Sequence, residues 1–414
     1  MELIQGKSIH CGIAIGYIQL LQDDLIDDSR IIMCSDLTPR ETISFGEKGV
    51  SALLVTNATP TSHTSIISRT MDIPAIAGID VNDLFDGKQC IVDGEKGIII
   101  IDPNEETIRM YQQKKKSDIE ENKTLADTYG KSFVKTKSGK AIPVYANISL
   151  PSDKELAIKN GSDGIGVFKS EFAYLNLHRF PTEDELYSIY NDIALSMPNK
   201  KVVFRTIDIG SDKTSDYMNI DKEENPALGL RAIRLCLKHL DVFKTQLRAI
   251  LRASSHGNVA IMYPMIISVD EVIKIKEIMK STMLELKKEG ISFDEHIEQG
   301  IMIETPAASI LSDELAKYVD FFSIGTNDLT QYMLAADRQN PNLSNYYNPN
   351  HPAIKRSIKQ IIANAHKENI WVEISGELGG NPDAIEWLIE YGVDALAVSP
   401  SKILKIKKRI TELL

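Results

Sequence analysis

Side chains able to do chemistry stand at or just past the ends of apolar, strand-like runs in the second half of the chain. Arg205 offers a planar fork for a phosphate or a carboxylate, and Lys169 adds a point charge. Glu304 and Asp328 are hard oxygen ligands of the kind that Mg²⁺ takes. The strand ends and the loops after them also supply Asn327, Ser375, Glu377, Lys213, Arg231, Arg234 and Arg338. This set predicts a cationic pocket for a small, multiply anionic substrate and a metal; a phosphorylated carboxylic acid fits, as do phosphosugars and acyl phosphates.

Eight such runs alternate with helical patterns over residues 139–414, which is the size and rhythm of a (β/α)8 barrel. Functional side chains of a barrel gather at the carboxyl ends of its strands, where the set above falls. We therefore expect an α/β fold with a TIM barrel; a doubly wound open sheet is the alternative. The runs are AIPVYANI (141–148), GIGVFKSE (164–171), KVVFRTID (201–208), VAIMYPM (259–265), GIMIETP (300–306), FFSIGTND (321–328), WVEISGE (371–377) and ALAVSPS (395–401).

A second candidate site lies in residues 1–102, where short strands and Gly-marked turns predict a small α/β domain. The segment LLVTNATPTSHTSIISR (53–69) is typical of a strand followed by the start of a helix, with His63 near the junction. Free N–H groups at a helix N-terminus, together with the neighbouring Ser and Thr hydroxyls, offer donors to an anion. His63 is therefore a candidate phosphoryl acceptor. On the residues alone, a role as a simple helix cap stays open.

Composition narrows the class of protein. The polar segment 103–138 predicts an exposed helical linker between the two domains. The formal net charge of −11 argues against nucleic acid as a partner. The four cysteines form no CxxC pair and predict neither a disulfide framework nor a zinc site. With no signal peptide and no apolar run long enough to span a bilayer, we expect a cytoplasmic enzyme with no membrane partner.

Longer motifs resemble one family over nearly the whole chain. They are TSHTSIISRTMDIPAIAG, DIGSDK, EENPALGLRAIR, QLRAILRAS, MYPMIISVDEV, ETPAA and DFFSIGTNDLTQYMLAADR. The first resembles the phosphohistidine signature, and the others resemble the barrel, of enzyme I of the bacterial phosphotransferase system for sugar transport. That enzyme is a phosphoenolpyruvate (PEP)–protein phosphotransferase, related to pyruvate phosphate dikinase and PEP synthase. The resemblance implies a swivelling phosphohistidine domain that precedes a PEP-binding barrel, and a homodimer formed through the barrel.

The resemblance also implies a role for each matching residue. His63 would be the phosphorylated histidine, with Thr38 close to it. Glu304 and Asp328 would ligate Mg²⁺. The acceptor would be the phosphocarrier protein HPr or another protein. PEP would be bound by Lys169, Arg205, Arg231, Asn327, Asp328 and Arg338.

Two differences from the family concern the chemistry. Ser375 stands where the family has a cysteine, the acid that protonates the enolate of pyruvate. A hydroxyl is far less acidic than a thiol, so slow net turnover or protonation by water, and poor reversal, are expected. Lys169 replaces an arginine that contacts the PEP phosphate. The charge survives but the fork is lost, which predicts weaker PEP binding.

Two further differences concern the architecture. The first strand runs almost directly into DLTPRET, which leaves no room for the helical subdomain that binds HPr. The usual mode of HPr docking is therefore not expected, and the acceptor is unidentified. Residues 58–60 replace a glycine-rich stretch before the histidine, and the chain ends soon after the eighth barrel unit, without the family's C-terminal helices.

Three functions follow as hypotheses. The first is transfer of the phosphoryl group of PEP to His63, with release of pyruvate, and then to an acceptor protein. The second is a catalytically impaired PEP-binding sensor, which the changes at Ser375 and Lys169 favour. The third is transfer to a small-molecule acceptor, as in the dikinases, although the chain has no room for their ATP-binding domain.

Overall fold

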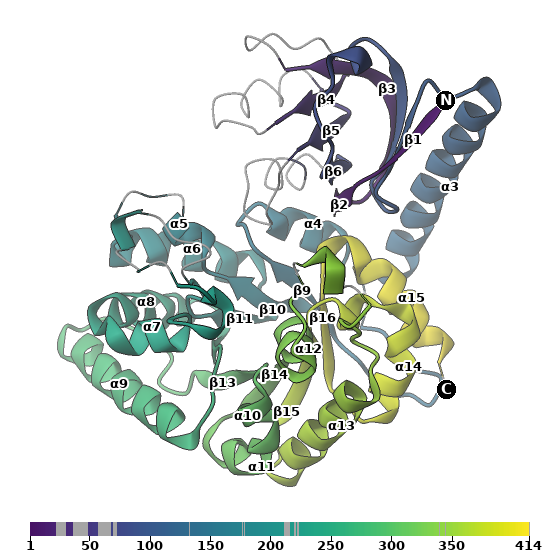
Figure 1. Ribbon diagram of the computed structural model, residues 1–414. Helices are drawn as coiled ribbons and strands as arrows, with labels where there is room; N and C mark the ends of the chain where they lie inside the picture. Colours follow the sequence, from purple (N-terminus) through teal and green to yellow (C-terminus); the bar gives the residue numbers. More distant parts are fainter. Residues whose placement is uncertain are drawn as a thin grey trace. The chain divides into compact units, whose positions relative to one another are not determined.

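In the computed structural model, the chain folds into two compact units, Met1–Thr124 and Leu125–Leu414 (Figure 1). The residues that the structure describes are 1–21, 30–35, 49–56, 68, 73–131, 133–175, 177, 179–210, 216–218, 221, 223–338, 340–343 and 345–413. Within them, no helix combines the length and the apolar character needed to cross a membrane.

The first unit is built on one eight-stranded mixed sheet with the order β1-β8-β7-β3-β4-β5-β6-β2. Strands β3 to β6 pair in parallel, and the outer pairs are antiparallel. Strands β7 and β8 form an antiparallel hairpin, and its turn contains Gly94 and Gly97. Gly97 has a φ of +67° and faces the Gly6 carbonyl so closely that a Cβ would lie 2.6 Å from its oxygen. The strands are β1 (Glu2–Gln5), β2 (Lys7–His10), β3 (Ile13–Leu20), β4 (Ile31–Cys34), β5 (Ala52–Val55), β6 (Ala75–Ala77), β7 (Gln89–Asp93) and β8 (Ile98–Ile101).

Helix α3 (Glu105–Tyr129) follows the sheet and crosses the boundary between the two units. Its first half packs on the sheet, where Tyr111 lies against Ile91 and Ile100. Lys114 Nζ donates to the buried Asp93 carboxylate over 3.0 Å. Although this segment is polar in composition, one face of the first half of α3 is therefore held against the sheet.

The second unit is a closed barrel of eight parallel strands, which confirms the TIM barrel predicted from the eight runs and excludes the open sheet (Figure 1). Strands β10, β11, β12 and β14 are almost entirely buried, as expected for a parallel sheet covered by helices. The strands are β9 (Val144–Ile148), β10 (Gly164–Lys169), β11 (Lys201–Arg205), β12 (Asn258–Tyr263), β13 (Glu298–Ile303), β14 (Phe321–Gly325), β15 (Trp371–Ser375) and β16 (Ala395–Val398).

Helices between the strands carry their own start signals. Thr182 and Glu185 form a capping box at the start of α6, and Ser268 caps α9. These helices are α4 (Asp153–Lys159), α5 (Phe172–Leu175), α6 (Glu183–Ser196), α7 (Ile233–Lys238), α8 (Leu240–Ser254), α9 (Val269–Lys288), α10 (Pro306–Ile310), α11 (Ser312–Leu315), α12 (Thr326–Leu334), α13 (Pro352–Lys367), α14 (Pro382–Glu390) and α15 (Ile403–Glu412).

The barrel interior is packed with side chains from alternate strand positions. Val203, Met262, Met302 and Phe321 form its apolar part, and the Trp371 ring stacks on Phe321 with centroids 4.4 Å apart. This packing closes the interior below the strand ends and leaves chemistry to their carboxyl edge.

Candidate functional site

The predicted site residues of the barrel lie together at the carboxyl ends of its strands. Lys169, Arg205 and Ser375 are the last residues of β10, β11 and β15. Glu304 directly follows β13, and Asn327 and Asp328 open α12 after β14. Parallel strands bring these positions to one edge, so residues up to 206 apart in sequence (169 to 375) meet there.

Arg205 is buried and held between two carboxylates. It forms one ion pair with Glu171, which follows the neighbouring strand β10, and a second with Asp208 at 3.1 Å. Burial alone would lower the pKa of the guanidinium, but Glu171 and Asp208 outweigh it and raise the pKa. Lys169 is in register with Arg205 on the adjoining strand and is exposed, so two cations face this side of the mouth.

Arg231 is the most connected side chain of the site. Its Nη2 donates to both oxygens of Asp208 at 2.8 and 3.0 Å, and its Nε donates to the same carboxylate at 3.1 Å. Its Nη1 donates to the Tyr332 hydroxyl at 3.0 Å and reaches Asp328 at 3.4 Å. The guanidinium is thereby fixed in one orientation between β11 and α12.

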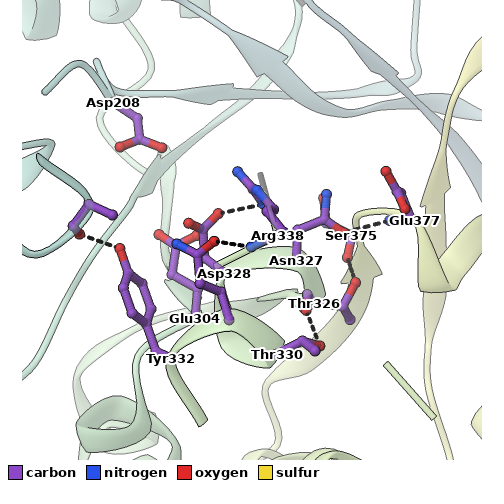
Figure 2. A network of polar contacts seen from close by, with 12 residues as sticks. Asp208, Glu304, Thr326, Asn327, Asp328, Thr330, Tyr332, Arg338, Ser375 and Glu377 are labelled. Carbon is purple, nitrogen blue, oxygen red and sulfur yellow. Dashed lines mark hydrogen bonds and ion pairs between the residues drawn. The ribbon is translucent and has the colours of Figure 1, made fainter. Parts of the chain in front are cut away.

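Glu304 is almost fully buried and only half satisfied. Its Oε1 accepts from the Met265 N–H at 2.7 Å, whereas its Oε2 has no hydrogen-bond partner among the described residues. Burial, followed by the charges of Asp328 and Asp208, raises the pKa of its carboxyl. Asp328 is bonded to Arg338 at 3.4 Å, as Figure 2 shows. An unsatisfied buried carboxylate oxygen beside a second carboxylate fits a hard divalent cation.

These two carboxylates do not make a complete metal site by themselves. No cluster of three or more His, Cys, Asp or Glu side chains suited to a metal exists within the described part of the chain. Substrate oxygens and water complete the shell of Mg²⁺ in sites that bind it with one or two carboxylates. The donor set therefore fits a metal that binds together with an anionic substrate.

Asn327 and Ser375 lie on neighbouring elements. The Asn327 Oδ1 accepts from the Glu377 N–H at 3.1 Å (Figure 2), and Thr326 Oγ1 donates to the Ser375 carbonyl at 2.8 Å. Gly376, with a φ of +96°, has no room for a side chain, since a Cβ would lie 2.5 Å from Thr326 Oγ1. The turn after β15 thus holds Ser375 against the start of α12.

The structure modifies the predicted cationic pocket. Arg205, Arg231 and Arg338 are each paired with a carboxylate, so the cluster is close to charge balance rather than strongly positive. Arg234 is not part of it, because its Nη1 donates to the carbonyls of Leu228 and Gly229 at 2.9 and 3.0 Å.

Sequence reasoning missed the residues that hold the arginines. Asp208, Glu171 and Tyr332 contact them directly, and Asn147 donates to the Ser375 hydroxyl at 3.3 Å. Asp208 and Glu171 are the last residues of two of the predicted strand runs, and this position at a strand end could have indicated that they belong to the site. The two small-domain residues, His63 and Thr38, and the barrel loop residue Lys213 lie outside the described residues.

Comparison with known proteins fits this architecture. Residues 123–414 match the family "PEP-utilising enzyme, PEP-binding domain", and residues 26–97 match "PEP-utilising enzyme, mobile domain". The chain is 41% identical over 398 residues to the phosphoenolpyruvate-protein phosphotransferases of Priestia megaterium and Staphylococcus aureus (strain MSSA476), which covers 96% of this chain and 69% of each relative. The chain belongs to the phosphoenolpyruvate-protein phosphotransferase family of PEP-utilising enzymes, as its motifs predicted.

Solved structures add little to this assignment. The Haloferax volcanii malate synthase lead(II) complex is 12% identical over 67% of this chain and 73% of its own, with a TM-score of 0.43. That score is too low for any argument about this chain.

Proposed function

We propose that this protein is a PEP-dependent phosphotransferase that moves the phosphoryl group of PEP to His63, releases pyruvate, and passes the group on to an acceptor protein. The observation that carries the proposal is the cluster at the barrel mouth, where Arg231 and Arg338 pair with Asp328 and the charges of Arg205 and Arg231 act on Glu304. Phosphoryl transfer depends on positioning and charge neutralisation, which such an arrangement supplies.

In this proposal, the three arginines, Lys169 and Asn327 clamp the phosphate and carboxylate of PEP. Glu304 and Asp328 hold Mg²⁺, which would offset the charge of the transferring phosphoryl group. The arginines are paired with carboxylates, so the site offers both charges. Anionic PEP would bind the arginines and the metal cation would bind the carboxylates. Binding of one should therefore favour binding of the other.

The affinity for Mg²⁺ should increase with pH. Burial and neighbouring carboxylates raise the pKa of Glu304, and a metal binds only the ionised form, so protons compete with Mg²⁺ below that pKa. We expect up to about tenfold tighter binding per pH unit between roughly pH 6 and 8. Calorimetric titration of Mg²⁺ in the presence of PEP measures this, with Glu304→Gln as the control that flattens the profile. A flat profile in the wild type would contradict the assignment of Glu304.

Replacing Lys169 by arginine should tighten PEP binding. The residue ends β10 beside Arg205, and a guanidinium restores two parallel N–H donors to the phosphate where the ammonium offers a point charge. We expect KM for PEP to fall about tenfold, or about 1.4 kcal/mol. Initial rates of pyruvate release against PEP concentration test this. Lys159→Arg, in the last turn of α4, is the matched control and should leave KM unchanged.

The central experiment is incubation with Mg²⁺ and PEP labelled on the phosphate. Acid-labile label on the wild type but not on His63→Ala, with one pyruvate released per label, supports the proposal. Binding of PEP without label on the wild type would overturn it and favour a sensor. The relatives carry the name of an enzyme, and the comparisons do not support a sensor or a small-molecule acceptor.

Several expectations remain part of the proposal. We retain residues 1–102 as the swivelling domain, 103–138 as the linker and 139–414 as the barrel. An acceptor such as HPr, a homodimer through the barrel and a cytoplasmic location are proposed on the family resemblance.

A further inference from the structure

A carboxylic acid lies in the barrel interior directly beneath Ser375. Glu373 is 0% exposed and stands two residues before Ser375 on β15, so both side chains point to the same, inner face. Its Oε1 accepts from the Ser323 hydroxyl at 2.7 Å, and its Oε2 has no partner among the described residues. The side chain reaches across to β10, where a Cβ on Gly166 would lie 2.7 Å from Oε2.

The surroundings of Glu373 favour its neutral form. Ser323, Gly166 and Ala397 bring no charge, and Tyr145 of β9, an ionisable group that interacts with Glu373, has its own pKa raised by burial and by Glu373. Burial raises the pKa of Glu373 to about 8, against a smaller lowering by Ser323. The group is thus a neutral acid at pH 7, comparable in strength to a thiol of pKa about 8.5 and much stronger than a serine hydroxyl.

Asn147 of β9 contacts the Ser375 hydroxyl at the upper end of this space. Its Nδ2 donates to Ser375 Oγ at 3.3 Å and to the Ala397 carbonyl at 2.8 Å, while its Oδ1 has no partner in the described chain. The Cα atoms of Glu373 and Ser375 are about 6.6 Å apart along the strand, a gap that a glutamate side chain and one water can bridge. A buried water bonded to Glu373 Oε2, Asn147 Oδ1 and Ser375 Oγ would have the three partners that such waters usually have.

We propose that Glu373 supplies the proton that converts the enolate of pyruvate to pyruvate, through Ser375 and one bridging water. The inference rests on the proposed phosphotransferase function. The Ser375 O–H bond breaks as a C–H bond forms at C3 of the enolate. The water gives a proton to Ser375 Oγ and takes one from Glu373 Oε2. After the transfer, the enolate has become the keto form of pyruvate, and the serine hydroxyl and the water are restored. Glu373 is left as a carboxylate, and solvent returns its proton before the next cycle.

A stereochemical experiment tests this role. PEP with tritium at one defined C3 position and a labelled phosphate is turned over once in D2O, and both the chain label and the chirality of the pyruvate methyl group are measured. The wild type should give chiral pyruvate at pH 7 that becomes racemic as the pH rises past about 8, because the ionised carboxyl has no proton to give. Glu373→Gln and Ser375→Ala should take up the chain label normally and release racemic pyruvate at every pH.

The control is Glu298→Gln. Glu298 begins β13 at the opposite, amino-terminal end of the barrel, where it bonds Lys201 and Trp371. This variant should release chiral pyruvate, like the wild type. Chiral pyruvate from Glu373→Gln, or racemic pyruvate from the labelled wild type at pH 7, would overturn the role of Glu373 but leave the proposed phosphotransferase function intact. A wild type that acquires no chain label would overturn the proposed function, and this inference with it. Normal labelling of each variant shows that it is folded.

Discussion

Replacing Arg231 by lysine should slow labelling of the chain by PEP about a thousandfold. The guanidinium makes three bonds to Asp208 and also reaches Tyr332 and Asp328, which a single ammonium cannot reproduce. Asp208 would lose its bidentate partner while still buried beside Arg205, and the clamp on PEP would lose its alignment. Disrupting a buried, hydrogen-bonded charge pair costs about 2–5 kcal/mol, and about 4 kcal/mol corresponds to a thousandfold in rate.

The matched control for this variant is Arg234→Lys. Arg234 lies three residues further along the chain, but it donates to the carbonyls of Leu228 and Gly229 and contacts none of the site carboxylates described above. We expect less than about a fivefold change in rate, because neutral hydrogen-bond acceptors of this kind contribute about 1 kcal/mol or less. Equal losses from the two variants would show that the loop before α7, rather than the Arg231 fork, controls the rate. Circular dichroism of each variant checks that the fold is retained.

The barrel was predictable because its signal is local and repeated. Each strand is a short apolar run, and the residues that end these runs are the polar ones, so the carboxyl edge of Lys169, Arg205 and Ser375 follows from chain order alone. The hairpin of β7 and β8 was predictable for a similar reason, since glycines bound its turn.

The pairing inside the site was not predictable in the same way. Arg231 meets Asp328 across 97 positions of sequence, and Arg205 meets Glu171 across 34. A list of residue types gives the sign of each charge but not its partner, so the site was expected to be cationic, whereas its arginines are paired. Glu373 was hidden for a related reason, because a glutamate within an apolar strand gives no sign of which face it occupies until the barrel closes.

Loss of Lys407 should destabilise the barrel by about 3–5 kcal/mol, the cost of leaving a buried charge without its partner. Lys407 of α15 is 0% exposed, and its Nζ donates to Asp163 Oδ1 at 2.8 Å and to the Gly161 carbonyl at 2.6 Å. Asp163 also accepts from the Val144 N–H at 2.9 Å, so the pair fastens the last helix where β9 and β10 begin. Urea unfolding of Lys407→Met measures the loss, and the fluorescence of Trp371 and Trp387, both within Leu125–Leu414, follows the barrel alone.

The charge, rather than the packing, should account for most of that loss. Burial raises the pKa of Asp163 while Lys407 lowers it, so removing the lysine raises the pKa further. A carboxyl with a raised folded pKa lowers stability as pH rises through its unfolded value of about 3.9, so the penalty in Lys407→Met should shrink between pH 7 and about pH 4. Adding Asp163→Asn, which removes the charge and keeps an acceptor for Val144, should recover at least half of the loss at pH 7. A penalty that is the same at both pH values and in the double variant would instead assign the effect to the packing of the lysine side chain.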